Sequence, residues 1–147
     1  MFTFLSDALL TWLDVVREDK ELVVTDDVAV LSKPPLADLS SISPCTHKEA
    51  DTRMLLHVAH AVQHGHQRII IQTVDTDVVV LAVAAAQGLK PADELWVAFG
   101  TGKGFRYLAA HEISGGLGPE KPCALSVFHA LTGCDTLSSF AEEEPLR

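Results

Sequence analysis

Five acidic side chains occur at three places along the chain where their spacing permits metal binding. Asp75 and Asp77 follow the apolar segment RIIIQTV, Glu49 and Asp51 lie within EADTR, and Asp135 follows HALTGC. Two carboxylates held close together repel one another unless a cation or a proton lies between them. Carboxylate oxygens are also the ligands that hard divalent cations prefer. These five acids are therefore our candidate metal ligands.

Each group of acids also has a structural explanation. An acid directly before a helix can cap its first N–H groups, and an acid in the first turn is favoured by the helix dipole. Thr46 and Glu49 match the capping-box spacing, and Asp135 can be an N-cap. Capping explains one member of the pair of Asp75 and Asp77 better than it explains both. We favour the functional reading for that pair and leave both readings open for the other acids.

Hydrophobic periodicity predicts the elements that position these acids. Apolar residues recur at helical spacing from Lys48 to Gln63, and Gly65 is expected to end this helix. The β-branched, nearly continuous apolar segment from Arg68 to Val74 predicts a central strand covered on both faces. The segment VVVLAVAAAQ after Asp77 predicts a buried helix, with a strand as the alternative.

The remaining segments complete an α/β pattern. ELVVT and VAVLS predict a hairpin that turns at Asp26 and Asp27, and ELWVAF predicts a strand whose hairpin partner is FRYLAAHEI. An amphipathic helix is expected at the start of the chain, and another from Pro119 to Leu131. We therefore predict an α/β fold in one domain over residues 1–147. Its expected form is three layers, a mainly parallel sheet with helices on both faces and a β-hairpin at its edge.

The acidic segments as a set resemble the signature of PIN-like domains in the flap-endonuclease and Asteroid-like group, including versions found in proteins linked to mobile elements. EADTR, then DTD after an apolar strand, then HALTGCDT after a helix occur in the family's order between Thr46 and Phe140. The resemblance implies a site for two Mg²⁺ or Mn²⁺ ions that activate water and cleave phosphodiester bonds in DNA or RNA. By motif position its metal ligands are Glu49, Asp51, Asp75, Asp77 and Asp135. Among them, Asp51, Asp75 and Asp77 are the expected catalytic residues.

The chain departs from the family's pattern before Glu49. The family begins with a strand that ends in an Asp, and here Asp26 and Asp27 are instead typical of turn residues. The family's basic arch also has no counterpart. These departures predict an N-terminally incomplete domain. They also support an alternative function, in which a catalytically inactive PIN-like fold acts as an interaction module or is a remnant of a mobile-element protein.

Composition limits the partners of the chain. With 147 residues and 48% hydrophobic content, the sequence is sufficient for one compact domain. Its net charge of −9 predicts weak nucleic-acid binding by this chain alone, because such affinity comes mostly from Lys and Arg. Three cysteines without CxxC spacing favour an intracellular protein, nuclear or cytoplasmic. No apolar stretch has the length of a membrane span, so no membrane partner is expected.

Two further patterns carry weaker chemistry. His57, His60 and His64 share a helical face and could bind a transition metal, although a solvated helix face is the commoner explanation. The segment GTGKG lacks the spacing of a phosphate-binding loop and is expected to be a glycine-rich turn. Lys103 and Arg106 nevertheless lie close enough to a strand end to touch a phosphate.

Overall fold

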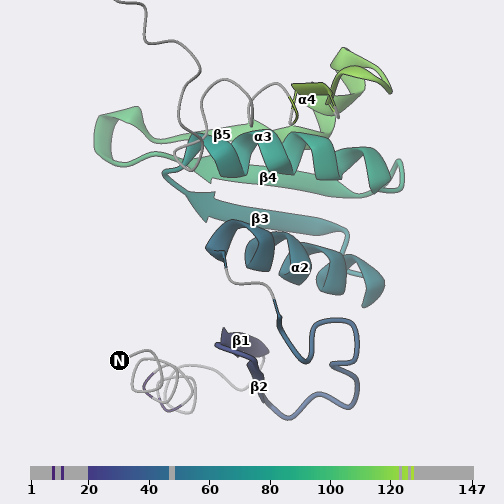
Figure 1. The fold of residues 1–147 in the computed structure, drawn as a ribbon. Coiled ribbons are helices and arrows are strands. Elements are labelled where there is room, and N and C mark those ends of the chain that lie inside the picture. Colours follow the sequence, from purple (N-terminus) through teal and green to yellow (C-terminus); the bar gives the residue numbers. More distant parts are fainter. Residues whose placement is uncertain are drawn as a thin grey trace, which may run out of the picture. The chain divides into compact units, whose positions relative to one another are not determined.

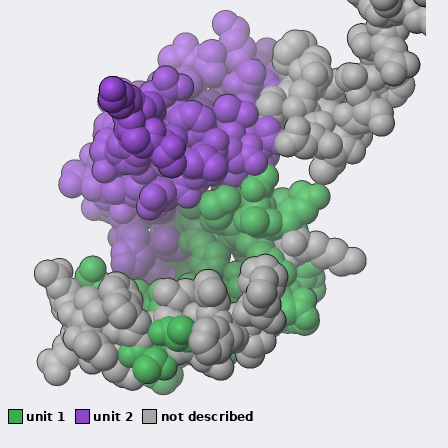
Figure 2. All heavy atoms as spheres, turned by 90° about the vertical axis from the view of Figure 1, so that its left-hand side faces the viewer, with its two compact units in different colours: residues 1–60 green, residues 61–147 purple. Residues whose placement is uncertain are grey.

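The fold of the computed structural model is mixed α/β and contains two sheets. The structure describes residues 20–46 and 49–122 and the single positions 8, 11, 124, 125 and 127. The chain divides into two compact units, residues 1–60 and residues 61–147, shown in green and purple in Figure 2. The expectation of one domain over the whole chain stays a prediction.

The first unit contains the predicted hairpin. Strands β1 (Leu22–Asp26) and β2 (Ala29–Lys33) pair antiparallel, and the last pair of the ladder joins Asp26 to Ala29. Asp26 therefore belongs to the strand, and the turn is made by Asp27 and Val28. Asp27 has a φ of 52°, a left-handed conformation that Asp adopts more readily than most residues. The hairpin is confirmed, with its turn one residue later than expected.

Helix α2 (Ala50–Gln63) and its end at Gly65 are confirmed. The N–H of Gly65 donates to the carbonyl of Val62 at 3.0 Å, and the N–H of His66 donates to the carbonyl of Ala61 at 3.0 Å. Gly65 has a φ of 84°, which is accessible to glycine without strain. Together these contacts form the Schellman arrangement, in which a left-handed residue closes the last helical turn.

A three-stranded sheet forms the centre of the second unit. Strand β4 (Glu94–Phe99) lies between β3 (Arg68–Thr73) and β5 (Arg106–Ala109), as Figure 1 shows. β3 runs parallel to β4, whereas β5 runs antiparallel to it. The expectation that β3 is central is wrong for the sheet that the structure describes. Ile71 of β3 is buried, but Ile70 on the opposite face is 58% exposed, so the described residues do not cover both faces of β3.

Helix α3 (Thr76–Ala85), followed by a 3-10 turn, η1 (Ala86–Gly88), connects the two parallel strands. The expected buried helix is thus confirmed, and the strand alternative is excluded. α3 contacts β4, and the buried side chains of this unit include Val78 and Val83 of α3 and Leu95 and Val97 of β4. β3, α3 and β4 together form a parallel β–α–β unit.

Helix α4 (Ala110–Leu117) follows β5 directly and contacts both α3 and β4. We expected all of FRYLAAHEI to be a strand, so this expectation is wrong beyond Ala109. Positions 121, 122, 124, 125 and 127 are helical, and the rest of the expected helix up to Leu131 lies outside the described residues, as does most of the expected helix at the start of the chain. Within the described part of the chain, no helix is long and apolar enough to cross a membrane.

Candidate functional site

The parallel pairing brings two loops to one edge of the sheet in the second unit. β3 and β4 end opposite each other at the pair of Thr73 and Phe99. The N–H of Gly100 then donates to the carbonyl of Thr73 at 3.0 Å, which ties the start of one loop to the end of the other strand. We call residues 74–77 and 100–104 the carboxyl edge. Ligand groups in open α/β sheets characteristically lie at this edge.

Asp75 and Asp77 both lie at the carboxyl edge, at the start of α3. Asp75 is the N-cap, and its Oδ1 accepts a hydrogen bond of 2.8 Å from the N–H of Asp77. The N–H of Asp75 in turn donates to Oγ1 of Thr73 at 3.0 Å. The capping role considered for this pair is thus confirmed for Asp75, and Asp77 occupies the first helical turn. A cap of this kind stabilises a helix by about 1 kcal/mol.

Capping does not exhaust the ligand capacity of Asp75. An ionised carboxylate has two oxygens with about four acceptor positions, and the cap uses one of them. Asp75 is exposed, and Asp77 is partly exposed, so both are accessible from solvent. By type, their oxygens fit Mg²⁺ or Mn²⁺, although either ion needs further oxygens to complete its shell.

The second loop of the carboxyl edge is glycine-rich and carries positive charge. It contains the 3-10 turn η2 (Gly102–Gly104), and the chain continues from it into strand β5. Gly100 has a φ of 88°, and a Cβ at this position would lie 2.9 Å from the carbonyl oxygen of Gly104. The loop therefore requires glycine to fold back on itself. Lys103 is exposed, and the guanidinium of Arg106 lies 5.4 Å from the centre of the Phe99 ring.

Glu49 and Asp51 lie at the start of α2, in the first unit. The carbonyl of Glu49 accepts from the N–H of Arg53 at 3.2 Å and from Oγ1 of Thr52 at 2.9 Å. Because α2 begins at Ala50, Glu49 occupies the N-cap position and not the third helical position. The capping-box assignment with Thr46 is therefore wrong. Asp51 is an acid of the first turn, as expected.

Four of the five predicted ligands lie within the described residues, as two pairs. The structure brings Asp75 together with Asp77 in the second unit, and Glu49 together with Asp51 in the first, while Asp135 lies outside the described residues. Convergence of all five acids stays a prediction. Among the residues that the structure describes, no three His, Cys, Asp or Glu side chains are grouped so that they could hold a metal ion.

Two histidines of α2, His57 and His60, form side-chain contacts within the first unit. Nε2 of His57 lies 3.3 Å from Oγ1 of Thr25 in β1, and Nδ1 of His60 lies 2.7 Å from Oγ of Ser41. His60 is buried, so the expectation of a solvated histidine face is wrong there. Burial, and secondarily the neighbouring His60, lower the pKa of His57.

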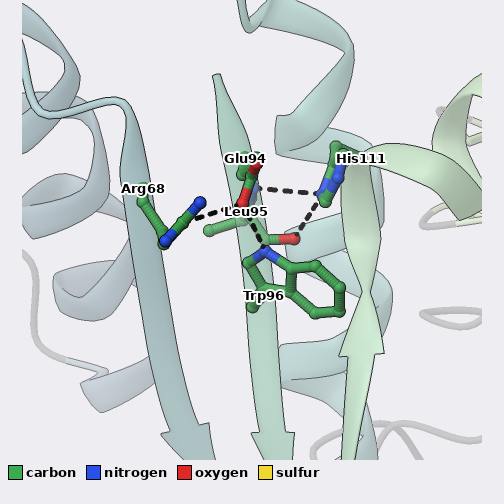
Figure 3. A network of polar contacts seen from close by, with 5 residues as sticks. All are labelled: Arg68, Glu94, Leu95, Trp96 and His111. Carbon is green, nitrogen blue, oxygen red and sulfur yellow. Dashed lines mark hydrogen bonds and ion pairs between the residues drawn. The ribbon is translucent and has the colours of Figure 1, made fainter. Parts of the chain in front are cut away.

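A polar network at the start of β4 was not found from the sequence. Oε2 of Glu94 accepts from Nε of Arg68 and from Nε1 of Trp96, each at 3.0 Å (Figure 3). The hydrogen bonds from Trp96 and Arg68 lower the pKa of Glu94. The tryptophan ring also meets the His111 ring edge-on, with 5.4 Å between the centroids.

His111 extends the hydrogen bonding of β4 beyond the end of β5. The antiparallel ladder ends at the pair of Trp96 and Ala109. One residue earlier, Nδ1 of His111 lies 3.0 Å from the carbonyl oxygen of Leu95 and 3.2 Å from its nitrogen. Figure 3 shows the imidazole beside these two backbone atoms. No signal in the sequence pointed to this role, because His111 falls in a segment that we expected to be a strand.

Comparison with known proteins finds no family model, no curated protein and no solved structure that matches this chain. The resemblance to PIN-like domains over residues 46–140 therefore rests on the acidic segments themselves. The parallel β3–α3–β4 unit is the part of the structure on which a function can be argued.

Proposed function

We propose that this chain is a PIN-like domain with the three-layer α/β arrangement, and that it cleaves phosphodiester bonds in DNA or RNA with the help of Mg²⁺ or Mn²⁺. One observation carries the proposal. Asp75 and Asp77 lie at the carboxyl edge of a parallel β–α–β unit, where α/β sheets bind their ligands. If active, the chain is a metal-dependent endonuclease or exonuclease.

The bound ions would supply an activated water and would neutralise charge on the attacking and leaving oxygens. The chain's own residues have two roles in this proposal. Asp75, whose Oδ1 accepts from the N–H of Asp77, would offer carboxylate oxygen to the ions together with Asp77. Glu49, Asp51 and Asp135 are the further ligands that the resemblance implies. In the facing loop, exposed Lys103 is suited to hold a phosphate of the substrate by its charge.

A second candidate function is an inactive PIN-like fold that serves as an interaction module or is a mobile-element remnant. A specific observation favours it: the cap formed by Asp75 gives this acid a structural role that needs no metal. The net charge of −9 also disfavours tight nucleic-acid binding. In the nuclease proposal the carboxylate charge of Asp75 binds a metal ion, whereas in the second candidate function Asp75 only caps α3.

Two substitutions at Asp75 separate these functions. Asp75→Asn keeps an oxygen that can cap α3 but removes the charge, whereas Asp75→Ala removes both. Labelled single-stranded and flap-bearing DNA and RNA are incubated with each protein in Mn²⁺. We expect little or no cleavage by the unmodified chain, because the family's upstream acids have no counterpart. Any cleavage that it shows should fall by about 100-fold or more in both variants.

Stability measurements complete the comparison. We expect Asp75→Asn to unfold at nearly the denaturant concentration of the unmodified chain, so that its loss of cleavage cannot come from unfolding. Cleavage that persists in Asp75→Asn would rule out a metal role for this carboxylate. An unmodified chain that neither cleaves these substrates nor binds Mn²⁺ would favour the interaction module.

A further inference from the structure

A cavity of about 490 Å³ lies at the amino end of β4, the opposite end from the carboxyl edge. Its volume falls within the range of about 300–1,000 Å³ that is typical of small-molecule sites. The walls come from η1, the following turn, α4 and the segment after α4, all within the second unit. Its described lining includes Leu89, Lys90, Asp93, His111, Ser114 and Pro119.

Asp93 is the acidic residue of this cavity, and its carboxylate has few protein partners. Its side chain belongs to a residue that is only 8% exposed. Oδ2 accepts from the N–H of Lys90 at 3.2 Å, and among the described residues this is the one donor that the carboxylate has. Within the same part of the chain, no Lys or Arg forms an ion pair with it. Every buried side-chain N or O atom of the described residues has a hydrogen-bond partner, so the second oxygen of Asp93, which has none, is open to solvent. This oxygen is available to accept a hydrogen bond from a ligand in the cavity.

The walls around Asp93 are held in place by hydrogen bonds. Nε2 of Gln87 donates to the carbonyl oxygens of Gly118 at 3.2 Å and Pro119 at 2.6 Å, which fixes the segment after α4 against η1. His111 is fixed on the backbone of Leu95. The cavity is therefore preorganised, and a ligand would lose little free energy in ordering it.

The chemistry of the lining indicates the ligand class. Leu89 and Pro119 offer apolar surface, the hydroxyl of buried Ser114 can accept a hydrogen bond, and Asp93 supplies negative charge. The net charge of −9 further favours cations over anions near the protein. We propose that this cavity binds a small organic cation, a protonated amine on an apolar body, with Asp93 as the acceptor of the ammonium group. This site is independent of the phosphodiesterase proposal.

The test uses three probes of matched shape on the full chain, labelled with ¹⁵N and followed by amide chemical shifts. Benzylamine carries the cation, benzyl alcohol is its neutral counterpart and benzoate carries an anion. We expect saturable shifts of the Lys90, Asp93 and Ser114 amides with benzylamine, and an affinity about tenfold or more above that for benzyl alcohol. Benzoate should leave these amides unshifted.

Three variants assign the effect to Asp93. Asp93→Asn keeps an acceptor for the Lys90 amide and should weaken benzylamine by about tenfold or more, while benzyl alcohol changes little. Asp75→Asn, at the opposite end of the sheet, should change neither the affinity for benzylamine nor the affinity for benzyl alcohol. Lys90→Ala retains the carboxylate and should bind benzylamine at least as well as the unmodified chain.

Several outcomes would overturn the proposal. These are an absence of saturable shifts with benzylamine, equal affinity for the three probes, tighter binding of benzoate, and unchanged benzylamine binding in Asp93→Asn. Loss of benzylamine binding in Lys90→Ala would also overturn the proposal, even if Asp93→Asn failed to fold. None of these outcomes bears on cleavage at Asp75.

Discussion

The two ends of β4 use acidic side chains in opposite ways. At the carboxyl edge, Asp75 is exposed and caps α3 through a hydrogen bond of 2.8 Å from Asp77. At the amino end, Asp93 is buried and accepts a single longer hydrogen bond of 3.2 Å. Asp75, which belongs to a sequence motif, thus already has a structural role as a helix cap. Asp93, which belongs to no motif, keeps one carboxylate oxygen open to the cavity.

This contrast shows that the spacing of acids along the chain and their burial in the fold give different information. Spacing along the chain, as in DTD, shows which acids can reach a common ion, but it does not show how much their charge costs in the fold. Burial gives that cost, because water screens an exposed carboxylate and cannot screen a buried one. At the carboxyl edge the acids have the spacing of a metal site but are not buried. At the amino end Asp93 is buried but belongs to no acidic motif.

The largest effect on stability is expected from Gly100→Ala at the carboxyl edge. A Cβ there would lie 2.9 Å from the backbone of Gly104, at a φ of 88°, so we expect a loss of about 1–3 kcal/mol in the free energy of unfolding. Gly102→Ala is the matched control, because its φ of 54° is also left-handed but nothing lies within 4 Å of the added Cβ. Urea unfolding should show the smaller loss for Gly102→Ala. Equal losses would mean that the clash with Gly104 is not the cause.

An intermediate effect is expected where Asp75 and Asp93 are compared directly. Asp75→Ala removes the cap of α3 and should cost about 1 kcal/mol, with Asp75→Ser close to the unmodified chain. Asp93→Asn removes the charge of a largely buried side chain while retaining an acceptor for the Lys90 amide, so its stability should be unchanged or higher. Chemical denaturation at neutral pH measures all three. A clear loss of stability in Asp93→Asn would show that its charge is compensated in the folded protein.

A related expectation concerns Asp77, whose charge lies next to that of Asp75. Asp77→Asn should raise the melting temperature slightly in chelator, because it relieves repulsion, and should reduce the stabilisation gained on adding Mn²⁺. Scanning calorimetry with and without Mn²⁺ tests both changes. A variant that melts lower in chelator and responds normally to Mn²⁺ would indicate that Asp77 acts only through the helix dipole.

The smallest effect is expected from pH and should be confined to the first unit. The pKa of His57 is lowered in the folded protein, so at mildly acidic pH the unfolded chain binds a proton more readily than the folded one. This contribution to stability is present above the unfolded pKa of about 6.5 and is lost as pH falls below it. Amide exchange of α2 and β1 between pH 7 and 5 should show the loss, and His57→Gln should reduce it. Protection that fell only around β4 would contradict this assignment.

Much of the fold was predictable because its signals are local. The hairpin of β1 and β2, helix α2 with its end at Gly65, and the buried helix α3 each follow from the periodicity and turn residues of one segment. The place of β3 at the edge of the described sheet depends instead on which strands pair, and no local pattern encodes that. Helix α4 was missed because Gly115 and Gly116 lower its propensity, while its stability comes from contacts with α3 and β4.

The residues of the candidate sites likewise include some that local sequence predicts and some that it does not. Placement of Asp75 and Asp77 at a strand end was predictable, because a strand followed by an N-cap and a helix is a local pattern. The burial of Asp93 was not, because α4 and the segment after it, which line the same cavity, are distant from Asp93 in the sequence. The same holds for His111, whose contact with Leu95 depends on β5 ending at Ala109.

The proposal that Asp75 and Asp77 hold a divalent cation can be tested by paramagnetic broadening of amide signals in Mn²⁺. With the full chain labelled with ¹⁵N, we expect the amides of residues 75–78 and 100–104 to broaden at the lowest Mn²⁺ concentrations. Mg²⁺ should restore them by competition, and Asp75→Asn should prevent the broadening. Signals of the carboxyl edge that stay sharp while other acidic regions broaden, or broadening that is unchanged in Asp75→Asn, would contradict the claim.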